Sequence, residues 1–159
     1  MKQITEQEAY LRLAALCAQA EHCQYEMQEK MRRWELSEEA LARVMQRLVT
    51  ERYVDDERYA RAFIKDKVRY NKWGRRKVEQ ALWAKHIDED IRQRVLDEVD
   101  DEEYIAVLRP LLQQKRKSTK ANSDYELNGK LIKFAMSRGF TMDIIKQCIN
   151  VTDEDEFLD

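Results

Sequence analysis

The sequence predicts an all-α protein built from three tandem three-helix repeats that form an elongated, curved molecule. Three glycines and one proline in 159 residues are too few for the many turns of a β-sandwich. The good helix formers Ala, Leu, Glu, Lys, Arg and Gln dominate the composition. One sequence pattern also recurs at intervals of 51 and 53 residues. Together these observations favour a repetitive helical fold.

The repeat is clearest at three junctions between helices. Each junction has a helix end, one apolar residue, and then Ser, Asp or Thr as the N-cap of the next helix. The junctions are Trp34–Ser37, Lys85–Asp88 and Arg138–Thr141. Apolar positions before the junctions also align, in the triplets Met27, Val78, Leu131 and Met31, Leu82, Ala135. We expect these aligned positions to face the cores of the repeats.

Helix starts supply the third element of each repeat. Acidic residues from Asp55 and from Asp100 suit a first helical turn, and Thr5 and Glu8 have the spacing of a capping box. We predict nine helices, over residues 5–20, 24–34, 37–51, 55–71, 74–85, 88–99, 101–117, 123–137 and 141–150. Pro110 is expected to kink or divide the seventh helix.

These helices predict three domains and a tail. The repeats cover residues 5–54, 55–99 and 100–152, and the acidic segment 153–159 is expected to be disordered. Each helix is too short to be stable alone, so neighbouring repeats must cover one another's apolar faces. The polar linker from Lys115 to Asp124 is expected to be the most mobile stretch.

The net charge of −2 conceals a strongly polarised chain. Residues 58–86 carry ten basic and two acidic side chains, and residues 105–138 carry eight and two, whereas the remaining blocks are acidic. Such polarity favours an acidic or polyanionic partner over a small ligand.

One helix, beginning near Asp55, carries a basic stripe. Its five cations fall within an arc of about 80°. They are Arg58, Arg61, Lys65, Arg69 and Lys72. Tyr59, Ala60, Phe63 and Tyr70 lie roughly opposite and are expected to face the core. Because the stripe itself contains no acid, we interpret it as a contact surface, although basic helix faces are often simply solvated.

Two further basic groups extend this surface. Arg75, Arg76 and Lys77 follow Gly74 at a helix N-terminus, where the helix dipole disfavours cations. We expect a partner to neutralise them. The second group contains Lys115, Arg116 and Lys117, with Lys130, Lys133 and Arg138 nearby in the last repeat.

The sequence offers little for catalysis or metal binding. Cys17, His22 and Cys23 match no common zinc spacing, and the acidic clusters are explained by their positions on first helical turns. We expect no catalytic residues, no metal and no cofactor. Trp34, Trp73 and Trp83 are expected to pack between helices. No secretory or membrane-spanning pattern is present, so we expect a cytoplasmic protein.

The middle of the chain resembles the RecX family of bacterial regulatory proteins that bind the recombinase RecA. The resemblance rests on Asp56-Glu57-Arg58-Tyr59-Ala60, followed by Gly74, two basic residues and Val78, and then by Leu82 and Ile87. The first and third repeats match more loosely. His86 and the Trp34-Glu35 pair stand where the family usually has a helix-ending glycine.

The resemblance implies a non-enzymatic modulator that lies along the groove of the RecA filament on single-stranded DNA. Such a protein opposes filament extension, ATP hydrolysis, strand exchange and co-protease activity. We expect a monomer with no membrane partner, and the basic faces allow a weak direct contact with DNA. Two alternatives remain open: a helix-turn-helix DNA-binding regulator and a plain helical-repeat scaffold.

Overall fold

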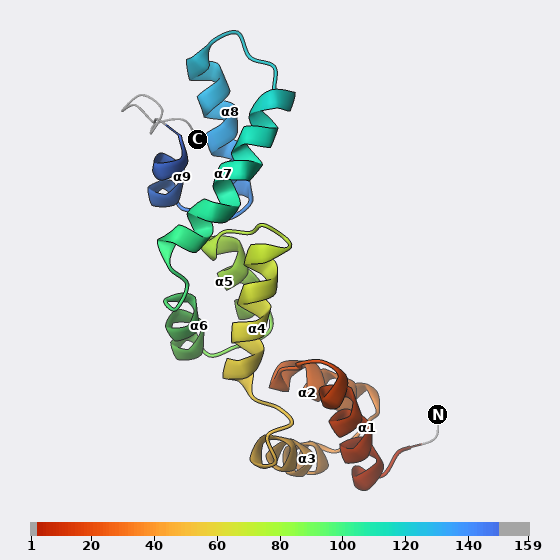
Figure 1. The fold of residues 1–159 in the computed structure, drawn as a ribbon. Helices are drawn as coiled ribbons and strands as arrows, with labels where there is room; N and C mark the ends of the chain where they lie inside the picture. Colours follow the sequence, from red (N-terminus) through yellow and green to blue (C-terminus); the bar gives the residue numbers. More distant parts are fainter. Residues whose placement is uncertain (1–2, 150–159) are drawn as a thin grey trace. The chain divides into compact units, whose positions relative to one another are not determined.

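The computed structural model describes residues 3–149, and these residues form nine helices and no strand (Figure 1). The all-α prediction is confirmed, and the predicted ends of each helix lie within three residues of the observed ends. None of these helices is long and apolar enough to cross a membrane. The helices are α1 (Glu6–Gln19), α2 (Gln24–Arg33), α3 (Glu38–Thr50), α4 (Asp56–Arg69), α5 (Arg75–Ala84), α6 (Glu89–Leu96), α7 (Asp101–Ser118), α8 (Asp124–Ser137) and α9 (Met142–Cys148).

The chain divides into two compact units. Unit 1 contains the residues up to Phe63 together with Leu82–Val95, and unit 2 contains Ile64–Ala81 together with the residues from Leu96 onward. Helices α4, α5 and α6 each contribute residues to both units. The expected elongated and curved shape stays a prediction.

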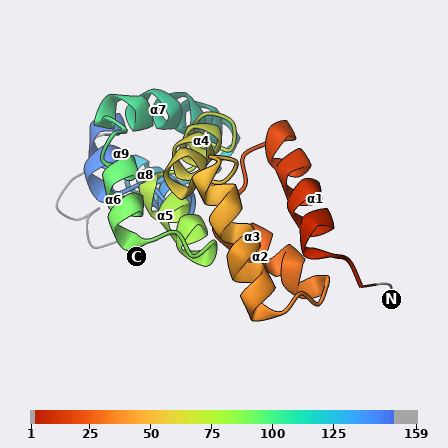
Figure 2. The same cartoon turned by 90° about the horizontal axis from the view of Figure 1, so that it is seen from below.

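Unit 1 is built on α1, α2 and α3, which Figure 2 shows as one group. Helices α1 and α2 both pack on α3. The core between them is apolar and includes Leu13, Met27, Met31 and Leu48, all fully buried. The backbone N–H of Glu8 donates to Thr5 Oγ1 at 3.1 Å, so the predicted cap of the first helix is present.

Unit 2 is built on α7, which packs on α8 and α9. Helix α7 is one continuous helix (Figure 1). Pro110 lies in its interior, so of the two effects expected, a kink or a division, the division does not occur. A proline has no N–H to donate to the carbonyl four residues earlier, here that of Ala106. Both residues are exposed, so water can satisfy that carbonyl and the helix continues.

The tandem repeat of three-helix units is confirmed by burial. Every member of the two aligned triplets, from Met27 to Leu131 and from Met31 to Ala135, is 0% exposed. At each junction one residue adopts a left-handed conformation: Glu35 has φ 61°, His86 has φ 58° and Gly139 has φ 92°. The following N–H then donates to a carbonyl of the preceding helix, which closes the helix end in the same way in all three repeats.

Two aromatic residues are more exposed than the sequence suggested. Tyr70 was expected in the core but is 79% exposed, because α4 ends at Arg69 and the helical phase no longer applies to the next residue. Trp83 was expected to pack between helices but is 68% exposed. The predicted acidic tail, 153–159, lies outside the described residues.

Candidate partner and nucleic-acid interface

The start of α5 is held against the end of α8 within unit 2. The backbone N–H of Gly74 donates to the carbonyl of Arg138 at 2.8 Å, and that of Arg76 donates to the carbonyl of Gly139 at 3.0 Å. A Cβ atom on Gly74 would lie 2.4 Å from the backbone of Phe140, and one on Gly139 would lie 2.4 Å from Cβ of Lys77. Only glycine allows both close approaches.

This junction bears on the cations at the start of α5. The electropositive N-terminus of α5 meets carbonyls at the electronegative end of α8, which offsets part of the unfavourable interaction between the α5 dipole and Arg75, Arg76 and Lys77. Arg75 also pairs with Asp97 at 2.7 Å. For Arg75, therefore, the fold itself supplies a counter-ion, whereas the sequence suggested only a partner.

Trp73 lies between two cations of the same region. The Lys77 ammonium is 4.8 Å from the Trp73 ring centroid and that of Lys67 is 5.2 Å away. These distances are typical of cation–π contacts. Arg76 is exposed and has no acidic partner among the described residues.

The members of the predicted basic stripe differ in whether they have acidic partners. The first two, Arg58 and Arg61, form ion pairs within unit 1. Arg58 pairs with Glu21 at 2.7 Å and donates to the carbonyls of Arg52 and Tyr53. The hydrogen bond that Arg58 donates to the Glu21 carboxylate raises the pKa of Arg58.

Arg61 pairs with Glu57 at 3.3 Å, one turn earlier on α4. Hydrogen bonds from Arg94 and Arg61 lower the pKa of Glu57. The face is therefore less uniformly basic at its start than the stripe alone suggested.

The remaining members of the stripe belong to unit 2 and, unlike Arg58 and Arg61, form no ion pair within the described residues. Lys65, Arg69 and Lys72 are exposed, and no acidic partner is found for them within residues 3–149. Lys72 adopts a left-handed conformation with φ 58°, and its ammonium donates to the Arg69 carbonyl at 3.4 Å. These three side chains are open to an external anion.

The second predicted basic group lies on α7 and α8, and two of its cations contact an aromatic ring. Lys115 and Arg138 lie 4.9 and 5.2 Å from the ring centroid of Phe134. Arg116 donates to Asn128 at 3.3 Å.

Lys130, also in this group, pairs with Glu126 at 3.3 Å, whereas Lys117 and Lys133 are exposed with no acidic partner in the described part of the chain. Unit 2 thus combines unpaired cations with half-buried aromatic rings.

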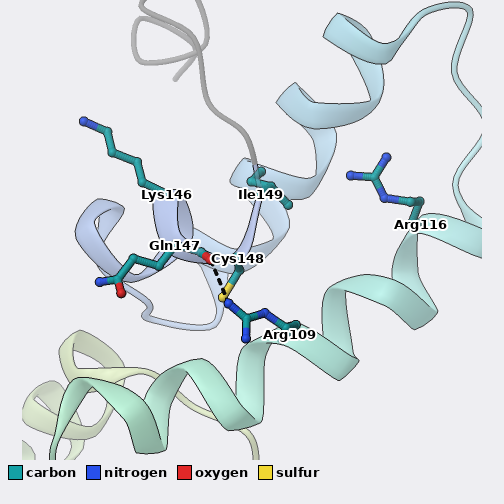
Figure 3. A pocket seen from close by; sticks show the side chains of 6 residues that line it. All are labelled: Arg109, Arg116, Lys146, Gln147, Cys148 and Ile149. Carbon is teal, nitrogen blue, oxygen red and sulfur yellow. Dashed lines mark hydrogen bonds between the residues drawn. The ribbon is translucent and has the colours of Figure 1, made fainter.

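Two cations of unit 2 were missed by sequence reasoning. Arg109 and Lys146 line a pocket of about 320 Å³ with Arg116, Gln147, Cys148 and Ile149, and its lining contains no acidic side chain from residues 3–149 (Figure 3). Arg109 donates to the Gln147 carbonyl at 2.9 Å and so ties α7 to the end of α9. The seven-residue spacing of Arg109 and Arg116, two helical turns, was the available signal. Lys146 lies in an otherwise acidic block.

The cysteines show no arrangement suited to a metal. Burial raises the pKa of Cys23 to about 11, and its thiol lies 3.9 Å from the Lys85 carbonyl. Burial also raises the pKa of Cys17. A metal ligand must be a thiolate, so both environments disfavour coordination. Among the described residues, no group of three His, Cys, Asp or Glu side chains could hold a metal ion.

The comparisons with known proteins agree with this architecture. The family model for the second three-helix domain of RecX matches residues 55–96, and that for the third matches residues 101–149. A crystal structure of RecX from Lactobacillus salivarius superposes with a TM-score of 0.82 at 19% identity, covering 90% of this chain and 93% of that one. This last likeness concerns the fold alone.

Relatives identified by sequence bear the name "Regulatory protein RecX". One from Bacillus cytotoxicus is 24% identical over 150 residues, covering 94% of this chain and 56% of its own length. One from Clostridium botulinum is 32% identical over 124 residues, covering 77% and 58%. The chain thus spans little more than half the length of these relatives. The two domain matches nevertheless cover more than half of the chain, which belongs to the RecX family of regulatory proteins.

Proposed function

We propose that this protein is a non-enzymatic modulator of the recombinase RecA. It binds along the groove of the RecA–single-stranded DNA filament and inhibits filament extension, and thereby ATP hydrolysis, strand exchange and co-protease activity. The proposal is supported by membership of the RecX family and by one observation: unit 2 exposes cations that have no acidic partner within the described residues.

In the part of unit 2 that the structure describes, the exposed cations without an acidic partner include Lys65, Arg69, Lys72, Arg76, Lys117 and Lys133. Exposed charges of one sign repel each other and hold counterions, so an acidic protein surface or a row of phosphates gains by replacing those counterions. A RecA filament on DNA offers both kinds of partner.

The composition of this surface favours charge recognition over base reading. Specific base recognition in the major groove uses a helix whose Asn, Gln or Arg side chains reach base edges. The unpaired members of the stripe, Lys65, Arg69 and Lys72, include no amide side chain and only one Arg, so they are poor in base-reading groups and rich in charge. We therefore propose that direct contact with DNA is weak and independent of sequence.

The test is the ATPase rate of RecA on single-stranded DNA with and without this protein. The wild type is expected to suppress the rate at substoichiometric ratios. The variant Lys65→Gln with Arg69→Gln should suppress less. Its binding to the RecA filament should also depend less steeply on salt, with a log–log slope smaller by about 0.7 for each of the two cations that contacts a phosphate. Circular dichroism must first show that the variant folds.

A matched control removes two cations from unit 1. Arg33 and Arg52 are exposed, and no acidic partner is found for them between residues 3 and 149. Arg33→Gln with Arg52→Gln should suppress RecA like the wild type. Equal suppression by both double variants would move the contact surface elsewhere, and no suppression by the wild type would contradict the proposed function.

A further inference from the structure

Trp83 lies in a pocket that the proposed function does not use. It belongs to the last turn of α5 and is 68% exposed, although an indole is among the largest apolar groups a protein can bury. A single exposed apolar residue is ordinary. Trp83, however, lines a concavity of about 490 Å³, which is within the range of about 300–1,000 Å³ typical of ligand pockets.

The wall of this Trp83 pocket is held in place by the turn between α5 and α6. His86 has φ 58° and its ring stacks on Tyr25 at 4.0 Å between centroids. Ile87, also in the wall, is 1% exposed. Arg92 donates from Nη1 to the Ile87 carbonyl at 2.7 Å. The pocket is therefore preformed, and all of its lining residues belong to unit 1.

The acidic side chains that line the pocket favour a positively charged ligand. Asp88 and Glu89 line it and are exposed, and no basic partner is found for either one among the described residues. The one cation in the lining, Arg92, has its Nη1 bonded to the turn and its Nε fully buried. The exposed side chains of the lining therefore include the Trp83 indole and two carboxylates, beside the His86 ring that stacks on Tyr25. Indole is the aromatic side chain that binds cations best.

We propose that the Trp83 pocket receives an arginine or lysine side chain from a basic segment of a protein partner. The side chain stacks on the Trp83 ring and pairs with the carboxylates of Asp88 and Glu89. This deepens the proposed function and rests on it only for the identity of the partner. A nucleobase stacking on Trp83 would bring phosphates toward two carboxylates, so nucleic acid is disfavoured here.

The direct test uses the indole N–H resonance of Trp83 in a ¹⁵N spectrum of the full chain. The probes are the capped tripeptides Gly-Arg-Gly and Gly-Glu-Gly, and a thymidine dinucleotide. We expect a saturable shift with the arginine peptide, at least about fivefold tighter than with the glutamate peptide, since opposite and like charges meet the same carboxylates. Added salt should weaken the arginine response. A larger response to the dinucleotide, or none to any probe, would overturn the proposal.

Two variants check the assignment. Trp83→Leu keeps an apolar side chain without the ring, so the affinity for the arginine peptide, followed by backbone resonances of α6, should fall several-fold but stay above that for the glutamate peptide, because both carboxylates remain. Glu89→Gln should weaken arginine binding about two- to fivefold, because one of two carboxylates is lost. Tyr125→Leu changes another exposed aromatic residue, 47% exposed in unit 2, and should bind as the wild type does. An unchanged arginine affinity in Trp83→Leu would also refute the assignment.

The two proposals fail in different ways. Suppression of RecA by the wild type without an arginine response would overturn the Trp83 pocket and leave the proposed function standing. If both hold, Trp83→Leu should require several-fold more protein for half-maximal suppression, while Tyr125→Leu should not. Equal suppression by Trp83→Leu and the wild type would exclude the pocket as a partner contact.

Discussion

The backbone N–H of Gly74 donates a 2.8 Å hydrogen bond to the carbonyl of Arg138, and this bond joins the start of α5 to the end of α8. The two residues belong to different three-helix repeats but to the same compact unit. The contact fixes where the cations at the start of α5 emerge and gives the α5 N-terminus an electronegative neighbour.

Replacing Gly74 by Ala should destabilise unit 2. The added Cβ would lie 2.4 Å from backbone atoms of Phe140, which cannot move aside as a flexible side chain would. Overpacking of this kind costs about 1–3 kcal/mol. Urea unfolding should show a lower midpoint for Gly74→Ala, with Gln114→Ala, an exposed site on α7, unchanged within about 0.5 kcal/mol. Wild-type stability in Gly74→Ala would show that the junction is not tightly closed.

Arg58 and Lys65 should have opposite phenotypes although both belong to the predicted stripe. Arg58 pairs with Glu21 and two backbone carbonyls, so Arg58→Gln should lower the free energy of unfolding by about 1–2 kcal/mol. Lys65 has no acidic partner in the described region, so Lys65→Gln should change stability by less than about 0.5 kcal/mol. Binding to RecA filaments should instead fall in Lys65→Gln. Thermal unfolding and filament binding, measured on both variants, separate the two roles.

Glycine at position 35 should stabilise the protein. Glu35 is exposed and has φ 61°, a conformation that is strained for residues with a Cβ atom. Glu35→Gly should raise the free energy of unfolding by about 0.5–1 kcal/mol. Gln28→Gly, in the interior of α2, should lower it by about 1 kcal/mol. Two losses of similar size would contradict the helix-ending role of position 35.

The contributions of Asp56 and Glu26 to the stability of the protein should depend on pH in opposite directions. Burial raises the pKa of Asp56 above its usual 3.8. Folding therefore favours its protonated form, and its contribution to stability is full below about pH 3.8 and is lost as pH rises through the raised value. Burial also acts on Glu26, but hydrogen bonds from the Cys23 N–H and Lys85 outweigh it and lower the pKa below 4.5. Its contribution is present above about pH 4.5 and is lost as pH falls.

Urea unfolding of two variants at about pH 3 and pH 7 tests these signs. The free energy of unfolding of Asp56→Asn, relative to that of the wild type, should be higher at pH 7 than at pH 3. Glu26→Gln should lose about 1–2 kcal/mol at pH 7, because charge-assisted hydrogen bonds are weakened, and less at pH 3. The same trend in both variants would show that burial does not dominate at Asp56.

Much of the fold was predictable because its signals are local. N-caps such as Thr5 and Ser37, first-turn acids and the apolar spacing around Met27, Val78 and Leu131 depend on neighbours within one or two turns. The helix bounds and the buried positions of the repeat followed from them. The predicted burial of Tyr70 was wrong because α4 ends at Arg69, and the helical phase does not extend to the next residue.

The candidate site was less predictable because its partners are distant in sequence. Helical phase shows that Arg58 and Lys65 share a face, but not that Glu21, from before α2, reaches only the first of them. Similarly, Lys146 joins Arg109 and Arg116 only through the packing of α9 on α7. Periodicity also does not show which helix faces lack a neighbouring helix. For this reason Trp83 was wrongly predicted to pack between helices.

The most direct measurement is cosedimentation of the protein with RecA filaments preassembled on single-stranded DNA, beside DNA alone and RecA alone. The account predicts strong association with filaments, weak association with DNA alone, and a marked loss for Lys65→Gln with Arg69→Gln but not for Arg33→Gln with Arg52→Gln. Association with bare DNA as strong as with filaments, or none with filaments, would contradict it.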